Sequence, residues 1–191
     1  MARYKQTSLH LVVVALSCVV VVSCQNLRYG HPGTKVRKEI VEAQYDKSGV
    51  KFSFPAYWTV TEDKAYGENE RQLVVADLPF SFVRIRIIAG QKPVDLRREV
   101  ENVDSKIQPT TPRGEGGRIT EINRTFQGQD HKGLRLKESY SDKEGSVGDT
   151  TDFFLVQSSK AQVLIILNAD DADWNASDKE FQLLLDSLKV T

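Results

Sequence analysis

The cysteines carry the most reactive side chains of this chain, and both lie within its first 24 residues. Cys24 follows an apolar stretch of 14 residues, Leu9 to Val22, and Arg3 and Lys5 precede that stretch. A basic start, a short apolar region and a small residue before the cleavage point are the marks of an export signal. The stretch is also shorter than the about 20 residues that a membrane-spanning helix needs. We therefore predict an export signal over residues 1–23.

The cleavage point before Cys24 resembles the bacterial lipobox. This resemblance implies that the Cys24 thiol receives a diacylglycerol and that its freed amine receives an acyl chain, which together anchor the chain stably in membrane lipid. Cys18 is a rival site, but it lies inside the apolar stretch, whereas Cys24 stands where the polar chain begins. Gln25 replaces the aspartate that tends to retain lipoproteins at the inner membrane, so we expect the outer membrane, facing the periplasm. An ordinary cleaved signal is the alternative.

The composition excludes several classes of site. Removing residues 1–23, which hold Arg3 and Lys5 and no acidic residue, leaves 168 residues with 24 basic and 26 acidic side chains. A chain of this length forms one domain with its own core. The small negative balance gives no strong field for nucleic acid. With Cys24 lipidated, no thiol remains for a nucleophile, a disulfide or a cysteine-based zinc site.

Two histidines are candidate metal ligands in the mature chain. His31 lies in a polar segment with glycines and proline, and His131 follows Asp130 in a stretch that we predict to be a turn. Two histidines 100 positions apart are a weak signal for a metal site. We therefore predict that His131 is a solvated turn residue.

Three aspartates, Asp170, Asp171 and Asp173, crowd the start of the last predicted helix. They lack the glycine and the distal glutamate of a calcium loop. Carboxylates at a helix start accept hydrogen bonds from free amides and favour the positive end of the helix dipole. We therefore predict that they cap the helix, and we expect no metal and no cofactor.

Four basic residues lie on the polar faces of predicted strands: Arg84, Arg86, Arg135 and Lys137. If their strands are neighbours, these side chains form one basic ridge that could bind an acidic partner or a phosphate. The alternative is that they serve only solubility. Arg84 and Arg86 are our first choice for a surface that binds a protein partner.

No pattern of a catalytic site stands out. Neither histidine lies near a serine in a Gly-x-Ser-x-Gly turn, and the glycines at 114–117 follow no predicted strand and open no helix, unlike a phosphate-binding loop. Carboxylates are plentiful, but nothing singles out a pair for acid–base catalysis. The residues therefore predict a protein that is not an enzyme.

Alternation of apolar and polar side chains predicts short strands. In the segment 80–89, apolar residues at every second position alternate with Arg84 and Arg86, which gives one buried and one wet face. The run 163–167 is apolar throughout, as in a central strand, and pairs with 153–157 across a turn. Further strands are predicted at 50–54, 58–60, 73–76, 119–126 and 134–137, with a turn at 128–133.

Two amphipathic helices are predicted among these strands. The first follows Pro93, and its apolar stripe is Leu96, Val100, Val103 and Ile107. The second is buried through Trp174, Phe181, Leu184, Leu185 and Leu188. The order of strands, helix, strands, helix predicts an α+β fold with helices packed on a mostly antiparallel sheet. The expected organisation is a signal at 1–23, a tether at 24–36 and a domain at 37–191.

Two motifs resemble the PsbP-domain proteins and the related DcrB lipoproteins. The segment GVKFSFPAYWTVTED at 49–63 is similar to the family's opening strand, and LLDSLKV at 184–190 is similar to the end of its last helix. Ala56 and Tyr57 stand before Trp58, where a glycine is commoner in the family. The resemblance covers about residues 38–190 and implies an α-β-α sandwich around an antiparallel sheet, with Trp58 in the core.

The resemblance also implies a class of function. The family includes an extrinsic subunit of photosystem II and many bacterial lipoproteins, and its members look like assembly or binding modules without shared catalytic residues. We therefore expect a lipid-anchored envelope protein whose domain binds or steadies a membrane protein complex. The alternatives are an envelope hydrolase, which needs a pocket with convergent polar groups, and a carrier of a small ligand or lipid, which needs an apolar cavity.

Overall fold

The computed structural model of the chain describes residues 40–77, 81–90, 92–107, 117–142, 145–158 and 160–191. The predicted export signal and tether, with Cys24 and His31, lie outside these residues. The described residues belong to one compact unit, Arg37–Thr191. No helix in this part of the chain has both the length and the apolar character needed to span a bilayer.

The described residues form strands and helices in the predicted alternation. Before the first helix come β1 (Glu42–Lys47), β2 (Val50–Pro55), β3 (Thr59–Ala65), β4 (Glu70–Asp77) and β5 (Ser81–Ala89). Then follow α1 (Leu96–Ile107), β6 (Arg118–Phe126), β7 (Gln129–Asp142), β8 (Gly145–Gln157), β9 (Ala161–Asp170), α2 (Trp174–Ser187) and β10 (Lys189–Val190).

The strands form two antiparallel sheets of unequal width. The large sheet has the order β3-β4-β5-β9-β8-β7-β6, and the small sheet has the order β1-β2-β10. β9 lies in the middle of the large sheet and pairs with β5 on one side and β8 on the other. Its seven residues from Ala161 to Leu167 are all buried, which confirms the prediction of a central strand covered on both faces.

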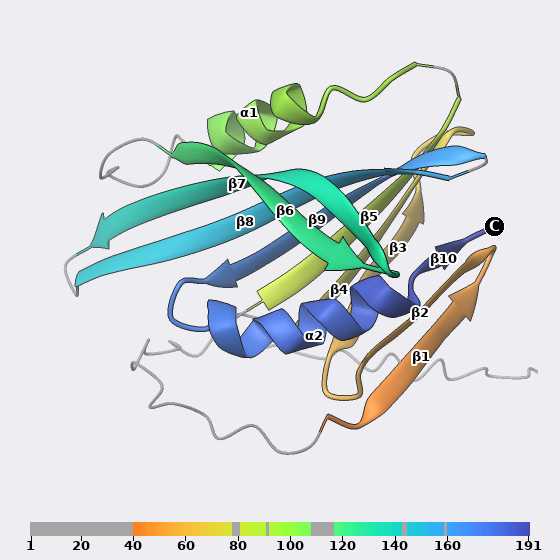
Figure 1. Ribbon diagram of the computed structural model, residues 1–191, viewed down its shortest axis with the longest axis horizontal. Helices are drawn as coiled ribbons and strands as arrows, with labels where there is room; N and C mark the ends of the chain where they lie inside the picture. Colours follow the sequence, from red (N-terminus) through yellow and green to blue (C-terminus); the bar gives the residue numbers. More distant parts are fainter. Residues whose placement is uncertain (1–39, 78–80, 91, 108–116, 143–144, 159) are drawn as a thin grey trace, which may run out of the picture. The chain divides into compact units, whose positions relative to one another are not determined.

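Each face of the large sheet carries one of the helices (Figure 1). α1 packs through Val100 on a small apolar cluster with Leu136, Phe153, Leu164 and Ile166. α2 packs on the other face, where the small sheet completes the main core. The largest side chains of that core are Phe52, Phe54, Trp58, Phe126, Phe154 and Phe181.

The predicted α+β class is the observed fold, and so are its main packing contacts. Trp58 is 3% exposed and meets the ring of Phe181 edge-on at 5.9 Å between centroids. Phe181, Leu184 and Leu185 form the buried side of α2, as predicted. α1 begins at Leu96 rather than directly after Pro93, because Asp95 caps the helix through its side chain and its carbonyl.

The turn predicted at 128–133 is wrong. Gln127 and Gly128 have φ angles of 53° and 71°, so the chain reverses within these two residues and β7 begins at Gln129. Gly133 lies inside β7, where a Cβ would stand 2.5 Å from the carbonyl oxygen of Phe153. The glycine there makes room for packing and does not mark a turn.

Candidate functional site

The four basic residues predicted from the sequence do not form one ridge. β5, which carries Arg84 and Arg86, is separated from β7, which carries Arg135 and Lys137, by β9 and β8. The paired residues across the sheet also place Arg84 on the same face as Leu134, so Arg135 and Lys137 project from the opposite face. The condition for a shared ridge, neighbouring strands, is therefore not met. The role of these residues in binding a partner stays a prediction.

Arg86 links the sheet to α1. Its Nε donates to Glu70 on β4 at 2.8 Å, and its Nη1 donates to Glu99 on α1 at 2.7 Å. Burial alone would lower the pKa of Arg86, but the carboxylates of Glu70 and Glu99 outweigh burial and raise it. Both charges of the guanidinium's neighbourhood are thus satisfied inside the domain, and Arg86 acts as a strut.

Arg135 is also held inside the domain. It donates two hydrogen bonds, at 2.6 and 2.8 Å, to the carboxylate of Asp152, which is 1% exposed. These bonds raise the pKa of Arg135. Its guanidinium carbon lies 4.8 Å from the ring centre of Trp174 on α2. Lys137 is exposed on the same face of β7.

A polar pocket of about 450 Å³ opens between β6, β7 and α2. Its lining residues are Ile122, Asn123, Arg124, Thr125, Arg135, Asp152, Asp178 and Gln182. Arg124 is paired with Asp178 at 2.9 Å, just as Arg135 is paired with Asp152. The two arginines and two aspartates balance each other's charge, so the pocket has hydrogen-bonding capacity without a net field.

Arg84 is the predicted residue that remains available for binding. Its guanidinium carbon lies 5.5 Å from the ring centre of Phe82, and its Nε is buried without a hydrogen-bond partner in the described residues. On β3, opposite this part of the sheet, Tyr66 donates to Glu62 at 2.6 Å. That bond lowers the pKa of Glu62, and the positive charge of Arg84 adds to the effect. We call Glu62, Tyr66, Phe82 and Arg84 the Arg84 patch.

The Arg84 patch is accessible beside α1. α1 packs against β7 and β8, whereas the patch lies on β3 and β5 and the turn after β3. Phe82 and Arg84 are half-buried, and Tyr66 is 46% exposed. A half-desolvated arginine over an aromatic ring, with one N–H unused, is the type of group that carries binding energy at protein interfaces.

His131 is not the solvated turn residue that the sequence predicts. It lies in β7, and its ring stacks on Phe126 at 3.8 Å between centroids. Its Nε2 is buried and has no hydrogen-bond partner among the described residues. Asp130 accepts a hydrogen bond from Thr125 and is turned away to that contact. No three potential metal ligands come together in the part of the chain that the structure describes.

The three aspartates before α2 do not cap it through their side chains, which corrects the prediction. Asp173 occupies the N-cap position without a side-chain hydrogen bond to the helix. Asp171 accepts a hydrogen bond from Thr150 instead, and Asp170 is the last residue of β9. Asp170 pairs across the sheet with Asp149. The group therefore belongs to the end of the large sheet rather than to the helix.

Asp149 is the titratable group with the most strongly altered environment here. Its partners on the two neighbouring strands are Glu138 and Asp170, so three acidic side chains form a row on one face. Burial raises the pKa of Asp149 to about 7, and Asp170 and Glu138 add to the rise. Burial raises the pKa of Asp170 as well. Asp149 lines neither the polar pocket nor the pocket described next.

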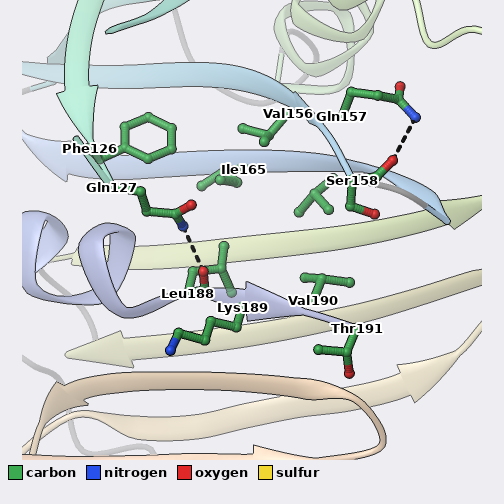
Figure 2. A pocket seen from close by; sticks show the side chains of 11 residues that line it. Phe126, Gln127, Val156, Gln157, Ser158, Ile165, Leu188, Lys189, Val190 and Thr191 are labelled. Atoms are coloured by element: carbon green, nitrogen blue, oxygen red, sulfur yellow. Dashed lines mark hydrogen bonds between the residues drawn. The ribbon is translucent and has the colours of Figure 1, made fainter. Parts of the chain in front are cut away.

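A second pocket, of about 380 Å³, lies beside the end of the chain (Figure 2). Apolar side chains line most of it: Phe126, Val156, Val163, Ile165, Leu188 and Val190. Polar residues stand around them: Gln127, Gln157, Ser158, Lys189 and Thr191. Figure 2 shows the Gln127 amide turned toward Leu188, whose carbonyl accepts its hydrogen bond at 2.6 Å.

The sequence pattern did not indicate these two pockets. Their residues come from four or more elements, and neither contains a local motif. The alternation that predicts the wet face of 80–89 does contain Phe82 beside Arg84, so this half of the Arg84 patch has a sequence signal. Glu62 and Tyr66 have none, because only the pairing of β3 with β4 and β5 brings them near.

No protein-family model matches the chain, and no curated protein matches it either. Among solved structures, it is similar to cyanobacterial PsbP (CyanoP) from Synechocystis sp. PCC 6803, with 14% identity, a TM-score of 0.48, and coverage of 85% of this chain and 99% of that chain. It is also similar to LpqN of Mycobacterium tuberculosis, described as involved in cell envelope biogenesis, with 15% identity, a TM-score of 0.41, and coverage of 81% and 92%. At these values the similarity concerns the arrangement of the chain, and the kinship with DcrB lipoproteins stays a prediction.

Proposed function

We propose that the chain is a lipid-anchored protein of the bacterial cell envelope whose domain binds another protein through the Arg84 patch, without chemistry of its own. The observation that carries this proposal is the state of Arg84. Its charge has no ion-pair partner among the described residues, its Nε–H is unused, and Phe82 supports it from below. A carboxylate from a partner would satisfy both the charge and the free donor.

The anchor supports the same proposal from the sequence side. A lipidated Cys24 would confine the domain to a layer near the bilayer, which raises its effective concentration for other membrane proteins. A single patch with one good arginine contact is then sufficient, even where the contact would be weak between free proteins.

The described pockets give more support to binding than to hydrolysis. In the polar pocket the arginines and aspartates are engaged with each other. The carboxyl group with a pKa near 7, Asp149, lies on the other face of the sheet from Arg135 and Asp152. A general acid must reach the reacting group to act. The carrier alternative depends on the apolar pocket of Figure 2, which we interpret differently below.

The test is crosslinking in native membranes with the full-length protein. A photoreactive group at position 82 should capture a partner, and Arg84→Glu should reduce the crosslinked product at least tenfold, because it replaces an attractive contact by repulsion. Arg97→Glu is the matched control, since Arg97 is exposed on α1 and pairs only with Glu101 in the same helix. Unchanged crosslinking in Arg84→Glu, at equal protein level, would show that the patch is not the binding surface.

A further inference from the structure

The small sheet ends one strand short of covering the large sheet. β10 is its outer strand and pairs with β2 on one side only. Beyond β10 the large sheet continues with β9 and β8, and the pocket of Figure 2 lies in this gap, with Ile165 and Val156 on one wall and Val190 on the other. The pocket is therefore an extension of the space between the two sheets.

The backbone of β10 presents hydrogen-bonding groups toward this gap. The N–H of Thr191 donates to the carbonyl of Gly49 at 2.9 Å, so residues 189 and 191 point their backbone groups at β2. In an antiparallel pair, the residues between them point the other way. The N–H and C=O of Val190 thus face away from β2, along the open edge.

Gln127 shows how this edge accepts a donor. Its side-chain amide donates to the carbonyls of Leu188, at 2.6 Å, and of Leu185, at 3.1 Å. Leu188 precedes Val190 by two residues, so its carbonyl belongs to the same outward row. One carbonyl of the row is already paired with an amide that does not belong to a strand, and the groups of Val190 come next.

The side chains around the gap select an extended partner with alternating character. Val190 faces the core together with Val50, its partner on β2, so a strand added beside Val190 would direct every second side chain into the apolar pocket. Lys189 points outward with Lys51 and is exposed. The intervening side chains of an added strand would therefore lie near positive charge.

We propose that β10 and the adjacent pocket bind an extended peptide segment of a partner protein by strand addition. The segment pairs with the backbone of Val190, places an apolar side chain between Val190 and Ile165, and places an acidic side chain near Lys189. This site lies on the opposite side of the large sheet from the Arg84 patch, so it goes beyond the function proposed above. The chain's own amino-terminal part enters the small sheet at β1, across β2 from β10, which favours a partner as the occupant.

The experiment measures binding of a fluorescent seven-residue peptide, in which valine alternates with glutamate, to the full-length protein in lipid nanodiscs. We expect saturable binding that is at least tenfold weaker for Val190→Pro, because proline removes the outward N–H and leaves the bonds of residues 189 and 191 to β2 in place. Val190→Thr keeps the N–H and the branched shape, and it should bind within about threefold of the wild-type chain. A peptide with methylated backbone nitrogens should not bind.

A second variant covers the case in which Val190→Pro fails to fold. Val156→Phe fills the pocket from β8, leaves β10 unchanged, and should also weaken binding at least tenfold. Equal binding of the methylated peptide, or no binding of the unmodified peptide, would overturn the proposal. Binding of palmitate that survives Val190→Pro and displaces the peptide would overturn it too, in favour of a lipid site. Arg84→Glu should leave peptide binding unchanged, which separates this result from the fate of the Arg84 patch.

Discussion

At the scale of single residues, the environment of Asp149 has the clearest consequence for stability. The side chain is half-buried in a row with Glu138 and Asp170, and its pKa is raised to about 7. In the unfolded chain an aspartate titrates at about 4. The folded domain therefore holds a proton on Asp149 between about pH 4 and pH 7 that the unfolded chain releases, and its stability falls as the pH rises through this window.

We predict that Asp149→Asn stabilises the domain at alkaline pH. Asparagine is neutral and can still donate a hydrogen bond to Asp170, so the free energy of unfolding at pH 8 should rise by about 1–3 kcal/mol, with little change at pH 4. Urea unfolding at both pH values measures this. Asp46→Asn, at an exposed residue paired with Lys51, is the control and should change little at either pH. Equal stability of Asp149→Asn and wild type at pH 8 would contradict the argument.

Predictions from the sequence succeed at this scale where the cause is local. Alternation alone placed Val83 and Ile85 in the core and Arg84 on the half-exposed face. It could not find Asp149, because its two acidic neighbours lie 11 and 21 positions away and meet it only through the register of β7, β8 and β9. The same register explains the error about Asp170, which the spacing assigned to a helix start.

At the scale of elements, Asp63 joins the two sheets at one edge. Its carboxylate accepts hydrogen bonds from Tyr45 and Lys47 on β1, both at 2.9 Å, and from Arg71 on β4 at 3.0 Å. The bond from Lys47 and those from Tyr45 and Arg71 lower the pKa of Asp63 to about 2. Burial and the bond to Asp63 raise the pKa of Tyr45 to about 12. Arg71 also donates to the carbonyls of Lys47 and Ser48, so the network fixes the turn after β1.

We predict that Asp63→Asn loosens the small sheet. A lowered pKa means that the ionised form stabilises the fold above about pH 4 and that this contribution disappears as the pH falls toward 2. Asp63→Asn should therefore cost about 1–3 kcal/mol of unfolding free energy at pH 6 and should flatten the loss of stability below pH 4. Hydrogen exchange of β1 amides should rise at the same time. Asp46→Asn again serves as the control, on the same strand pair. A variant as stable as wild type at pH 6 would show that the network contributes no net stability.

The elements that the sequence predicted best are those with a strong apolar pattern. β2, β5, β9 and the two helices have such a pattern, and each was found within a few residues of its bounds. β1 has mostly charged and polar residues and was missed, because it is held by the network around Asp63 rather than by a buried face of its own. β10 has two residues and no periodicity to detect. The length of β7 was underestimated, because Gly133 suggests a turn when read without Phe154 packed against it.

At the scale of the whole molecule, the proposed function depends on attachment to a membrane. Residues 1–24 carry the signal for it, and the domain contributes its binding surfaces. We predict that the mature protein begins at Cys24 and that this residue carries acyl chains, which mass spectrometry of the amino-terminal peptide can show. Cys24→Ser should abolish incorporation of labelled palmitate, whereas Cys18→Ser, within the apolar stretch, should leave it unchanged. An unmodified first residue on a freely soluble product would contradict the prediction.

The place of β9 in the sheet also bears on the way such a protein reaches its compartment. Residues 161–170 join β3, β4 and β5 to β8, β7 and β6. Until they are synthesised, the large sheet consists of two separate parts, and ribosomes add only about 5–20 residues each second. Pairing β5 with β9 also closes a long loop, which slows folding. For a chain that leaves the cytoplasm as an extended thread, the late arrival of its middle strand keeps the precursor open for the secretion channel for most of its synthesis.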